Sequence, residues 1–381
     1  MAVQSLSFIR TAPVEATPPP TAVRGPVGWV RENLFSSPLN IALTLLVAFL
    51  LWIALPPFLR FMIFDAVWTG SDRNACREDV IGRPVGACWA FVWDRLSYFV
   101  YGSYPPAERW RVDTFFALLT VGAVWMLWLK APRRGLGAAY FFIVFPVLSF
   151  LLLTGSERIG LPEVPTAFWG GILVTIIVSV VGIVLSLPFG VLLALGRRSR
   201  LPVVRLASVT FIEVVRGVPL ITVLIMANTM LPLFLPAGMS VDRLLRPLVG
   251  VALFASAYMA EVIRGGLQAV PKGQYEGAMS LGLGYWRMMY FIVLPQALRI
   301  VIPGIVNTFI GLFKDTTLVS IVGLLDLVRT IEASRVDPVW AAPTVSMTGY
   351  AFAGLFYFVF CYGMSRYSLM VERRLAAGQR R

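Results

Sequence analysis

Long apolar runs follow one another from residue 39 to residue 369 and limit what this chain can fold into. A helix needs roughly 20 apolar residues to cross a bilayer, because backbone N–H and C=O groups find no water there and must bond to one another. With 58% hydrophobic and 14% charged residues, the composition also lies outside the range of soluble domains. The expected fold class is therefore an all-α integral membrane protein. We predict eight spans, at residues 39–59, 113–129, 136–154, 167–195, 205–234, 245–264, 297–323 and 345–369.

The net charge of +13 follows this topology and not a nucleic-acid pattern. If the N-terminus lies inside, the inner segments hold a large excess of basic residues, densest in the short loops at 130–134 and 197–205, whereas the outer segments hold slightly more acidic than basic ones. Short cytoplasmic loops of membrane proteins carry such an excess of Lys and Arg. We therefore expect both termini in the cytoplasm and no nucleic-acid partner.

The chain divides near residue 160 into an extension with three spans and a core with five. A proline-rich segment with few aromatic residues precedes the first span and is predicted to be a disordered tail. The predicted parts are a disordered cytoplasmic tail at 1–38, the extension at 39–160 with an external loop at 65–112, the core at 161–371 with a cytoplasmic connection at 265–296, and a basic cytoplasmic tail at 372–381.

Two of the three cysteines, Cys76 and Cys88, share the predicted external loop, whereas Cys361 falls in the last span. In an oxidising compartment the first two could form a disulfide, worth about 3 kcal/mol in the chain-entropy model. Location alone supports this pairing, so two free thiols are an equal alternative.

Several kinds of chemistry have no residues to support them. The chain has no histidine, which removes His-dependent metal sites and the usual Ser-His and Cys-His nucleophiles. It also has no G-x-x-x-x-G-K-[ST] loop to cradle the phosphates of ATP. We predict no catalytic residue, metal site or cofactor in this chain, so any work must draw on an ion gradient or another polypeptide.

Charged residues inside predicted spans are candidate functional residues, since burying them in a membrane is costly. Glu213 and Arg216 lie three residues apart in FIEVVRGVPLI, so they share a helix face near its inner end and could either pair with each other or snorkel to the membrane boundary. Lys314 and Asp315 lie deeper, in GLFKDTTLVS, and point about 100° apart on a helix. Each needs its own partner unless the helix is interrupted there, and a structural role and a place in a transport path are both open.

Helix interruptions are predicted in the same region of the core. Gly217 and Pro219 follow Arg216, and Pro303 and Gly304 stand early in the seventh span. Broken helices are tolerated in membranes where the freed backbone lines a cavity or is buried in protein.

The stretch PKGQYEGAMSLGLGYWRMMYFIVLP, at 271–295, is too polar in its first half to continue a span. Pro271 and Gly273 are predicted to end the sixth span, and residues 274–281 to form about two helical turns closed by Gly282. Gly284 makes the turn, and 285–294 form a second helix that Pro295 terminates or kinks. The small residues Gly277, Ala278 and Gly282 would let another surface approach the first helix, and Glu276 lies near its start, where the helix dipole favours a negative charge. A docking element and an interfacial helix without a partner are both compatible with this pattern.

The spacing within this stretch resembles a known signature. Glu276, Gly277, Ala278, Gly282, Ile292, Leu294 and Pro295 fit the pattern E-A-A, three residues, G, nine residues, I-x-L-P. This is the cytoplasmic signature of permease subunits of bacterial ATP-binding-cassette (ABC) importers. Gly277 departs from the signature, where alanine is usual, at a cost of about 1 kcal/mol in helix propensity.

The resemblance extends over residues 165–371. The stretches at 169–199, 211–221, 256–278 and 294–318 resemble the polar amino acid branch of these permeases, the histidine/glutamine permease family. The extension, with GACWAF and YPPAERWR, is similar to the longer, M-type permeases of general L-amino-acid uptake systems.

The resemblance implies a five-helix type I importer permease core, preceded by a three-helix extension, in a bacterial inner membrane. It implies four kinds of partner: a homologous second permease subunit, two copies of a cytoplasmic ATPase that binds ATP and Mg, a periplasmic amino-acid-binding protein, and an amino acid as substrate. The implied ATPase-coupling residues are Gln274, Glu276, Gly277, Ala278 and Gly282. The implied core or translocation-path residues are Glu213, Arg216, Gly217, Pro219, Lys314 and Asp315. The alternative is an ion-coupled secondary transporter or channel, in which Glu213, Lys314 and Asp315 handle ions directly.

Overall fold

A computed structural model describes residues 25–128, 131–234, 236 and 241–379. The chain separates into two compact units, residues 1–66 and 67–381. The described residues form helices joined by turns, and their only β-type pairings are isolated bridges. The predicted all-α class is confirmed.

The helices that could cross a membrane agree with the eight predicted runs. Within the described residues, six helices are long and apolar enough to span a bilayer, and two bent helix pairs bring the number up to eight. The six are Pro38–Phe64, Pro106–Leu127, Gly135–Thr154, Ile172–Arg197, Leu245–Ala269 and Val345–Leu375. The bent pairs are Pro202–Gly217 with Leu220–Phe234, at 106°, and Tyr285–Ile300 with Ile302–Ser320, at 62°.

The first unit contains α1 (Gly25–Leu34) and α2 (Pro38–Leu59), which continues as a π-helical turn. Ser37 caps α2 by accepting from the backbone N–H of Asn40 at 3.2 Å. The prediction of a disordered tail at 1–38 is wrong for α1, while residues 1–24 lie outside the described part. The prolines that suggested disorder mostly precede α1, and Pro26 falls in its first turn, where a missing N–H breaks no bond.

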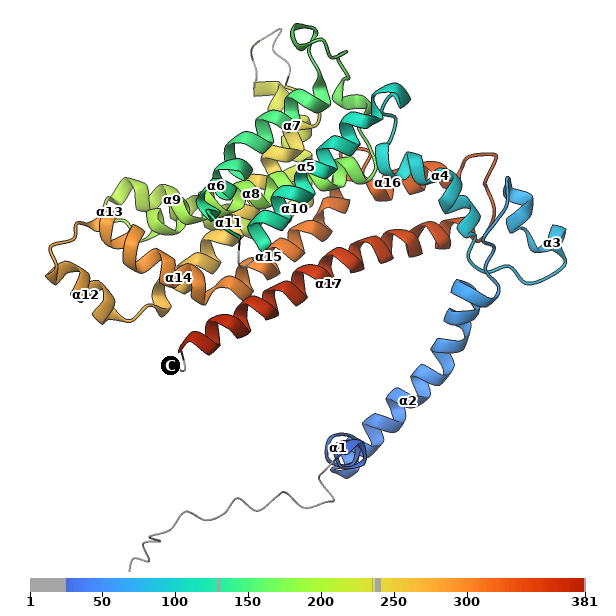
Figure 1. Ribbon diagram of the computed structural model, residues 1–381, viewed down its shortest axis with the longest axis horizontal. Coiled ribbons are helices and arrows are strands. Elements are labelled where there is room, and N and C mark those ends of the chain that lie inside the picture. Colours follow the sequence, from blue (N-terminus) through green and yellow to red (C-terminus); the bar gives the residue numbers. More distant parts are fainter. Residues whose placement is uncertain (1–24, 129–130, 235, 237–240, 380–381) are drawn as a thin grey trace, which may run out of the picture. The chain divides into compact units, whose positions relative to one another are not determined.

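The second unit contains the second and third spans of the predicted extension, α5 (Arg109–Leu127) and α6 (Arg134–Ala139) with α7 (Phe145–Thr154). The core comprises α8 (Ile172–Arg197), α9 (Pro202–Gly217), α10 (Leu220–Ile225), α11 (Leu245–Ala269), α14 (Leu294–Ile300), α15 (Ile302–Asp315) and α17 (Val345–Gln379), as Figure 1 shows.

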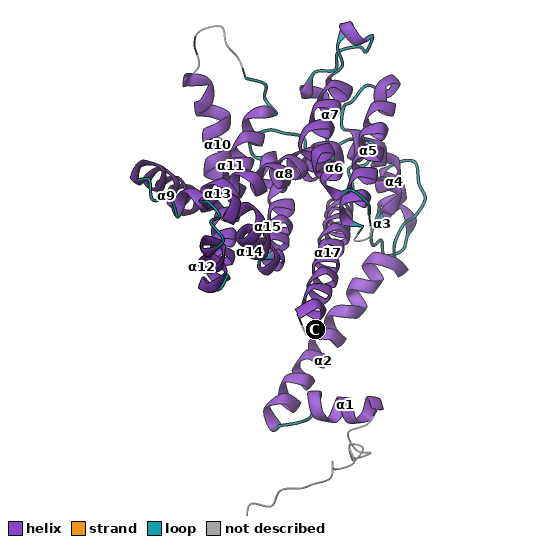
Figure 2. Cartoon of the chain, turned by 60° about the vertical axis from the view of Figure 1, so that its left-hand side comes forward, coloured by secondary structure: helices purple, strands orange, loops and turns teal. Residues whose placement is uncertain are grey.

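Small residues bring α8 and α11 close together at the centre of this core (Figure 2). A Cβ atom added at Gly190 of α8 would lie 2.6 Å from Cγ of Met259 of α11, and one at Gly182 would lie 3.1 Å from Val251. Helices in membranes associate through such small positions, because close backbones maximise packing.

One end of the second unit is assembled from segments far apart in sequence, namely predicted outer loops and the start of the fourth predicted span. A disulfide joins Cys76 to Cys88, with the Cα atoms 5.8 Å apart. The indole N–H of Trp340 donates to Asp94, on α4 (Trp89–Tyr101), at 2.7 Å. An isolated bridge joins Gly171 to Asp326, which caps α16 (Leu327–Arg335). The predicted external loop is therefore a folded cap.

The opposite end carries α12 (Lys272–Ser280) and α13 (Tyr285–Met288). The predicted connection at 265–296 is wrong at both edges, because α11 runs on to Ala269 and the helix after α13 continues to Ile300. Pro295 does not terminate that helix. A π-helical turn at Met289–Val293 precedes it, so Pro295 stands in the first turn of α14, where its missing N–H is tolerated.

The chain also remains helical in the predicted basic tail at 372–381, where α17 extends to Gln379. Glu, Arg, Leu and Ala dominate this segment, and all four favour helix.

Candidate functional site

The helix α12 is the nine-residue element expected between the sixth and seventh spans. It ends in a Schellman motif, in which the N–H of Leu283 donates to the carbonyl of Ala278 and the N–H of Gly282 donates to that of Met279. Gly282 has φ of 73°, in the left-handed region that favours glycine. The predicted helical turns closed by Gly282 are confirmed.

The exposed face of α12 contains most of the predicted coupling residues. Gln274, Glu276 and Gly277 are exposed, and a Cβ atom added at Gly277 would meet nothing within 4 Å. Met279 and Leu281 add apolar surface, with 57% and 78% of their area exposed.

Ala278 is the exception among the predicted coupling residues. It is 2% exposed and packs in a hydrophobic cluster with residues of α8, α11 and α14. It lies three residues after Tyr275, on the face of α12 that the chain covers, so it is closed to a partner. The expectation that Ala278 lies open to a second surface is wrong.

Tyr275 fastens α12 to the end of α11. Its hydroxyl donates to the carbonyl of Leu267 at 2.9 Å, and Arg198 donates to that hydroxyl at 3.1 Å and to Leu267 at 3.0 Å. The guanidinium of Arg198 also lies over the tyrosine ring, 5.6 Å from its centre. Movement of α12 is therefore coupled to α11 and to the loop after α8. Neither residue is among the site residues predicted from the sequence, although Arg198 lies in one of the most basic loops.

A cluster of charged side chains joins α8, α9 and α11 near this end. Glu261 of α11 is its centre: its carboxylate lies 2.9 Å from Arg197, 2.9 Å from Arg264 and 3.7 Å from Arg216. Arg197 also contacts Glu213 at 2.8 Å. We call these five residues the Glu261 cluster.

Glu213 and Arg216 do not pair with each other, which was one of the possibilities left open, although both residues belong to the cluster. They share the face of α9 that meets α8 and α11, and each finds a partner on another helix: Arg197 for Glu213, and Glu261 for Arg216. Glu261 is not among the site residues predicted from the sequence. The rule that flags charges within spans finds it, because α11 encloses it.

After the cluster the backbone turns sharply at Gly217 and Pro219. Val218 and Pro219 are extended, and the helices on either side meet at 106°. The predicted interruption is confirmed. A second break, at Val301, precedes Pro303.

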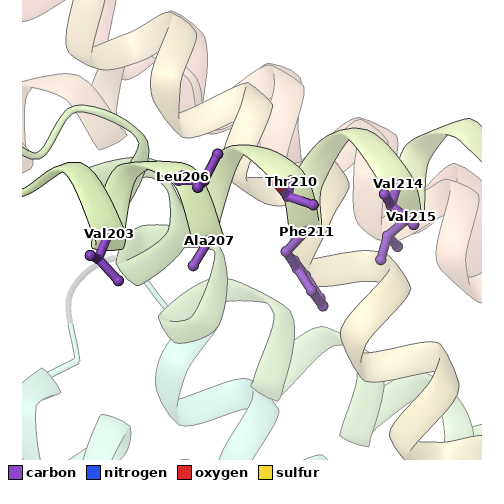
Figure 3. A pocket seen from close by; sticks show the side chains of 7 residues that line it. All are labelled: Val203, Leu206, Ala207, Thr210, Phe211, Val214 and Val215. Atoms are coloured by element: carbon purple, nitrogen blue, oxygen red, sulfur yellow. The ribbon is translucent and has the colours of Figure 1, made fainter.

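One face of α9 is lined almost entirely by apolar side chains (Figure 3). The residues along this shallow groove are Val203, Leu206, Ala207, Thr210, Phe211, Val214 and Val215. Val203 and Leu206 are 77% and 69% exposed. Apolar side chains on a membrane helix can remain exposed in this way, since lipid is as apolar as they are.

Lys314 and Asp315 lie at the end of α15, where the helix gives way to a 3₁₀ segment. Of the two alternatives left open for this pair, separate partners or an interrupted helix, the structure has the interrupted helix. Lys314 is exposed, Asp315 is half-buried, and neither has an ion-pair partner among the described residues. Asn307, Gly311 and Lys314 follow one another at helical spacing and form a polar stripe along α15. A Cβ atom added at Gly311 would meet nothing within 4 Å.

The described residues contain no group of three or more His, Cys, Asp or Glu side chains that could hold a metal ion. The charged cluster, the sharp break after α9 and the exposed α12 are features of a transport subunit and not of a catalytic centre. Their arrangement places an exposed helix at one end of a set of packed, bent membrane helices.

Comparison with known proteins supports this class. Residues 186–377 match the family described as binding-protein-dependent transport system inner membrane component. The chain belongs to this family. It is therefore a permease subunit of an ABC importer in an inner membrane, and the alternative of an ion-coupled secondary transporter or channel is set aside.

Two relatives are similar over nearly their whole length. YhdY of Escherichia coli strain K12, an inner membrane amino-acid ABC transporter permease protein, is 49% identical over 351 residues, covering 92% of this chain and 93% of the relative. BztC of Rhodobacter capsulatus, a glutamate/glutamine/aspartate/asparagine transport system permease protein, is 39% identical over 436 residues, covering 98% and 99%. A solved amino acid ABC transporter is 30% identical over 54% of this chain and 92% of its own, with a TM-score of 0.47.

Proposed function

We propose that this chain forms part of the path of an amino acid importer and receives the motion of a cytoplasmic ATPase through α12. The proposal rests on the structure of α12. This helix exposes Glu276, Gly277 and Met279, while the hydroxyl of Tyr275 bonds it to α11. A partner that pushes on this exposed face moves α11 as well. Polar amino acids are the proposed substrates, because the two long relatives are named as amino acid permeases.

The proposed assembly contains two permease subunits, this chain and a homologous second one, with two copies of the ATPase and a periplasmic amino-acid-binding protein. ATP and Mg bind in the ATPase, and closure of its dimer switches the permeases between inward-open and outward-open states as rigid bodies. Gln274, Glu276, Gly277 and Gly282 are the coupling residues of this chain.

The proposed translocation path runs along the polar stripe of α15. Asn307 and Lys314 are exposed and Gly311 leaves its surface open, so a second permease subunit facing this stripe would enclose a polar channel. Asp315 lies beside the stripe. The position of α9 depends on four predicted site residues: the ion pairs of Glu213 and Arg216 hold this helix, and Gly217 and Pro219 end it. We assign these four residues to positioning the path and not to contacting the substrate.

The proposed topology places α12 and both termini in the cytoplasm. It is supported by the contact of the basic loop after α8 with α12, since Arg198 and Tyr275 meet at this end. The disulfide end would then face the periplasm.

Cross-linking tests the docking face of α12. In a Cys361→Ser background, Glu276→Cys is expected to cross-link to a co-expressed ATPase subunit. The control Val336→Cys, 69% exposed at the opposite end, is expected not to do so. Amino acid uptake should require ATP. Uptake driven by an ion gradient in the isolated chain, without a cross-link at residue 276, would overturn the proposal.

A further inference from the structure

A cavity of about 690 Å³ lies between the extension and the core of the second unit. Its walls are α5, α7 and the turn before α7 on one side, and α8 with the start of α11 on the other. Phe115, Phe145 and Phe150 line the extension side, and Val181, Leu185 and Leu248 line the core side. A volume of this size is typical of sites for small molecules.

The cavity is elongated along the helices. Its lining on α8 extends from Ile177 to Leu185, which is about 12 Å of helix, and on the extension it extends from Phe142 to Thr154, about 18 Å. Half of the hydrocarbon core of a bilayer is about 15 Å thick. An acyl chain lying in one leaflet therefore has the length of this cavity.

The wall facing the surroundings is incomplete. Phe150 and Leu245 both line the cavity and are 62% and 49% exposed, whereas Phe145 is 2% exposed. In a bilayer such exposed apolar residues face lipid, so the cavity has a side through which an acyl chain can enter.

Hydrogen-bond donors without partners gather in the cavity. The indole N–H of Trp169 and the hydroxyl of Ser149 are buried, in residues that are 5% and 7% exposed, and neither has a partner in the described structure. The hydroxyl of Thr154 is also buried and unpaired. A buried donor without a partner costs about 1–3 kcal/mol, so this end of the cavity is suited to a ligand rich in acceptor oxygens.

An unpaired positive charge lies at the same end. Arg243 lines the cavity, its guanidinium lies against Gly323, and no ion pair to it is found among the described residues. The adjacent Asp242 is already occupied, since its carboxylate accepts from the hydroxyl of Thr166 at 2.6 Å and from the backbone N–H of Leu244 at 2.8 Å. This part of the lining therefore offers the N–H donors of Arg243 beside a carboxylate that already has its own donors, while the remainder of the cavity is apolar.

We propose that this cavity binds one glycerophospholipid of the surrounding leaflet, with an acyl chain between α7, α8 and α11 and the phosphate beside Arg243. Phosphate and ester oxygens would accept from Arg243, Trp169 and Ser149. The bound lipid fills the cavity between the helices of the extension and those of the core. The extension would then hold lipid against the transport helices. This inference does not depend on which substrate the importer carries.

Native mass spectrometry of the purified protein in detergent tests the proposal. The wild-type protein is expected to retain one phospholipid. Delipidated protein titrated with palmitoyl-oleoyl phosphatidylglycerol should bind it again with one-to-one stoichiometry. Arg243→Gln, which changes an exposed side chain and should not affect folding, is expected to weaken this binding about tenfold by loss of a charge-assisted hydrogen bond. The matched control Arg158→Gln, an exposed arginine that does not line the cavity, should bind as the wild type does.

A second pair of variants tests the apolar part. Val181→Trp would fill the cavity and is expected to abolish lipid retention, whereas Leu192→Trp, on the exposed side of α8, should leave it intact. Retention of a free fatty acid or of detergent alone in the wild type would overturn the proposal. Equal phospholipid binding by Arg243→Gln and the wild type would also overturn it.

Discussion

The carboxylate of Glu261 lies 2.9 Å from the guanidinium of Arg197, 64 residues earlier in the chain, and thereby joins α11 to α8. The side chain of Glu261 is 15% exposed, and three arginines share it. Glu213 also forms an ion pair with Arg197, but the side chain of Glu213 is 55% exposed.

Replacing Glu261 is therefore expected to cost more than replacing Glu213. Glu261→Gln would leave Arg197, Arg216 and Arg264 without their shared anion and lower the free energy of unfolding by about 2 kcal/mol. Glu213→Gln removes an exposed pair and should cost less than about 1 kcal/mol. Denaturation in mixed detergent micelles, followed by circular dichroism, measures both. Equal losses would show that Glu261 is not the centre of the cluster.

Gly282 should tolerate asparagine but not valine. Its φ of 73° costs a side chain about 1–2 kcal/mol, and less for asparagine, which adopts this conformation more readily. Gly282→Val is expected to loosen the end of α12 and abolish uptake while membrane insertion stays normal, whereas Gly282→Asn should retain most of the transport. The measurement is ATP-dependent uptake at matched protein levels in the membrane. Normal uptake by Gly282→Val would contradict a rigid α12.

Gly102 is expected to be far less replaceable than Gly82, although both have positive φ. A Cβ atom at Gly102 would lie 2.6 Å from the backbone nitrogen of Gly170, whereas one at Gly82 would meet nothing within 4 Å. Gly82→Ala should therefore cost only the conformational strain, about 1 kcal/mol. Gly102→Ala also forces the end of α4 away from the start of α8 and should lower the melting temperature much further. Similar melting temperatures for the two variants would argue against this close contact.

Asp326 is predicted to make stability depend on pH. Burial raises its pKa to about 6 from the usual 3.8, although backbone N–H groups of Val328 and Arg329 donate to the carboxylate. The folded state then binds the proton more tightly than the unfolded state, so this contribution is complete below about pH 4 and is lost as the pH rises through 6. Its size is about 3 kcal/mol.

Asp326→Asn provides the control for this pH dependence. The amide oxygen can still cap α16, but the group no longer titrates. Melting temperatures between pH 4 and pH 7 should fall for the wild type and change less for the variant. Parallel curves would assign the pH dependence to another group.

Loss of the disulfide should destabilise the folded cap. It closes a loop between residues 12 apart, so Cys76→Ser is expected to cost about 3 kcal/mol. Cys361→Ser, which removes a free thiol, should have little effect, and reductant should lower the melting temperature of the wild type but not of Cys76→Ser. A wild-type protein unaffected by reductant would contradict a stabilising disulfide.

The features predicted well are those that depend on local chemistry. Length and apolar content define a span, and a left-handed glycine ends a helix, so the eight runs and Gly282 follow from the sequence alone. The helix break at Pro219 is of the same kind.

The features that could not be predicted depend on the rotation of a helix about its axis or on contacts between residues far apart in the sequence. Ala278 turns inward because Tyr275 fixes the rotation of α12, and no local rule gives that rotation. Glu213 and Arg216 share a helix face but bind residues of other helices. The bond from Trp340 to Asp94 spans 246 residues, and the three-dimensional packing that creates it has no signature in either segment.

The length of α17 has a practical consequence for work on this protein. Its 35 residues make a rod of about 52 Å, which exceeds the roughly 40–45 Å of a bilayer with its headgroups. A fluorescent reporter fused to the end of α17 would therefore be attached to a continuous helix and not to a flexible linker. Energy transfer from such a reporter to a dye on another subunit would then measure how the distance between α17 and that subunit changes during the transport cycle.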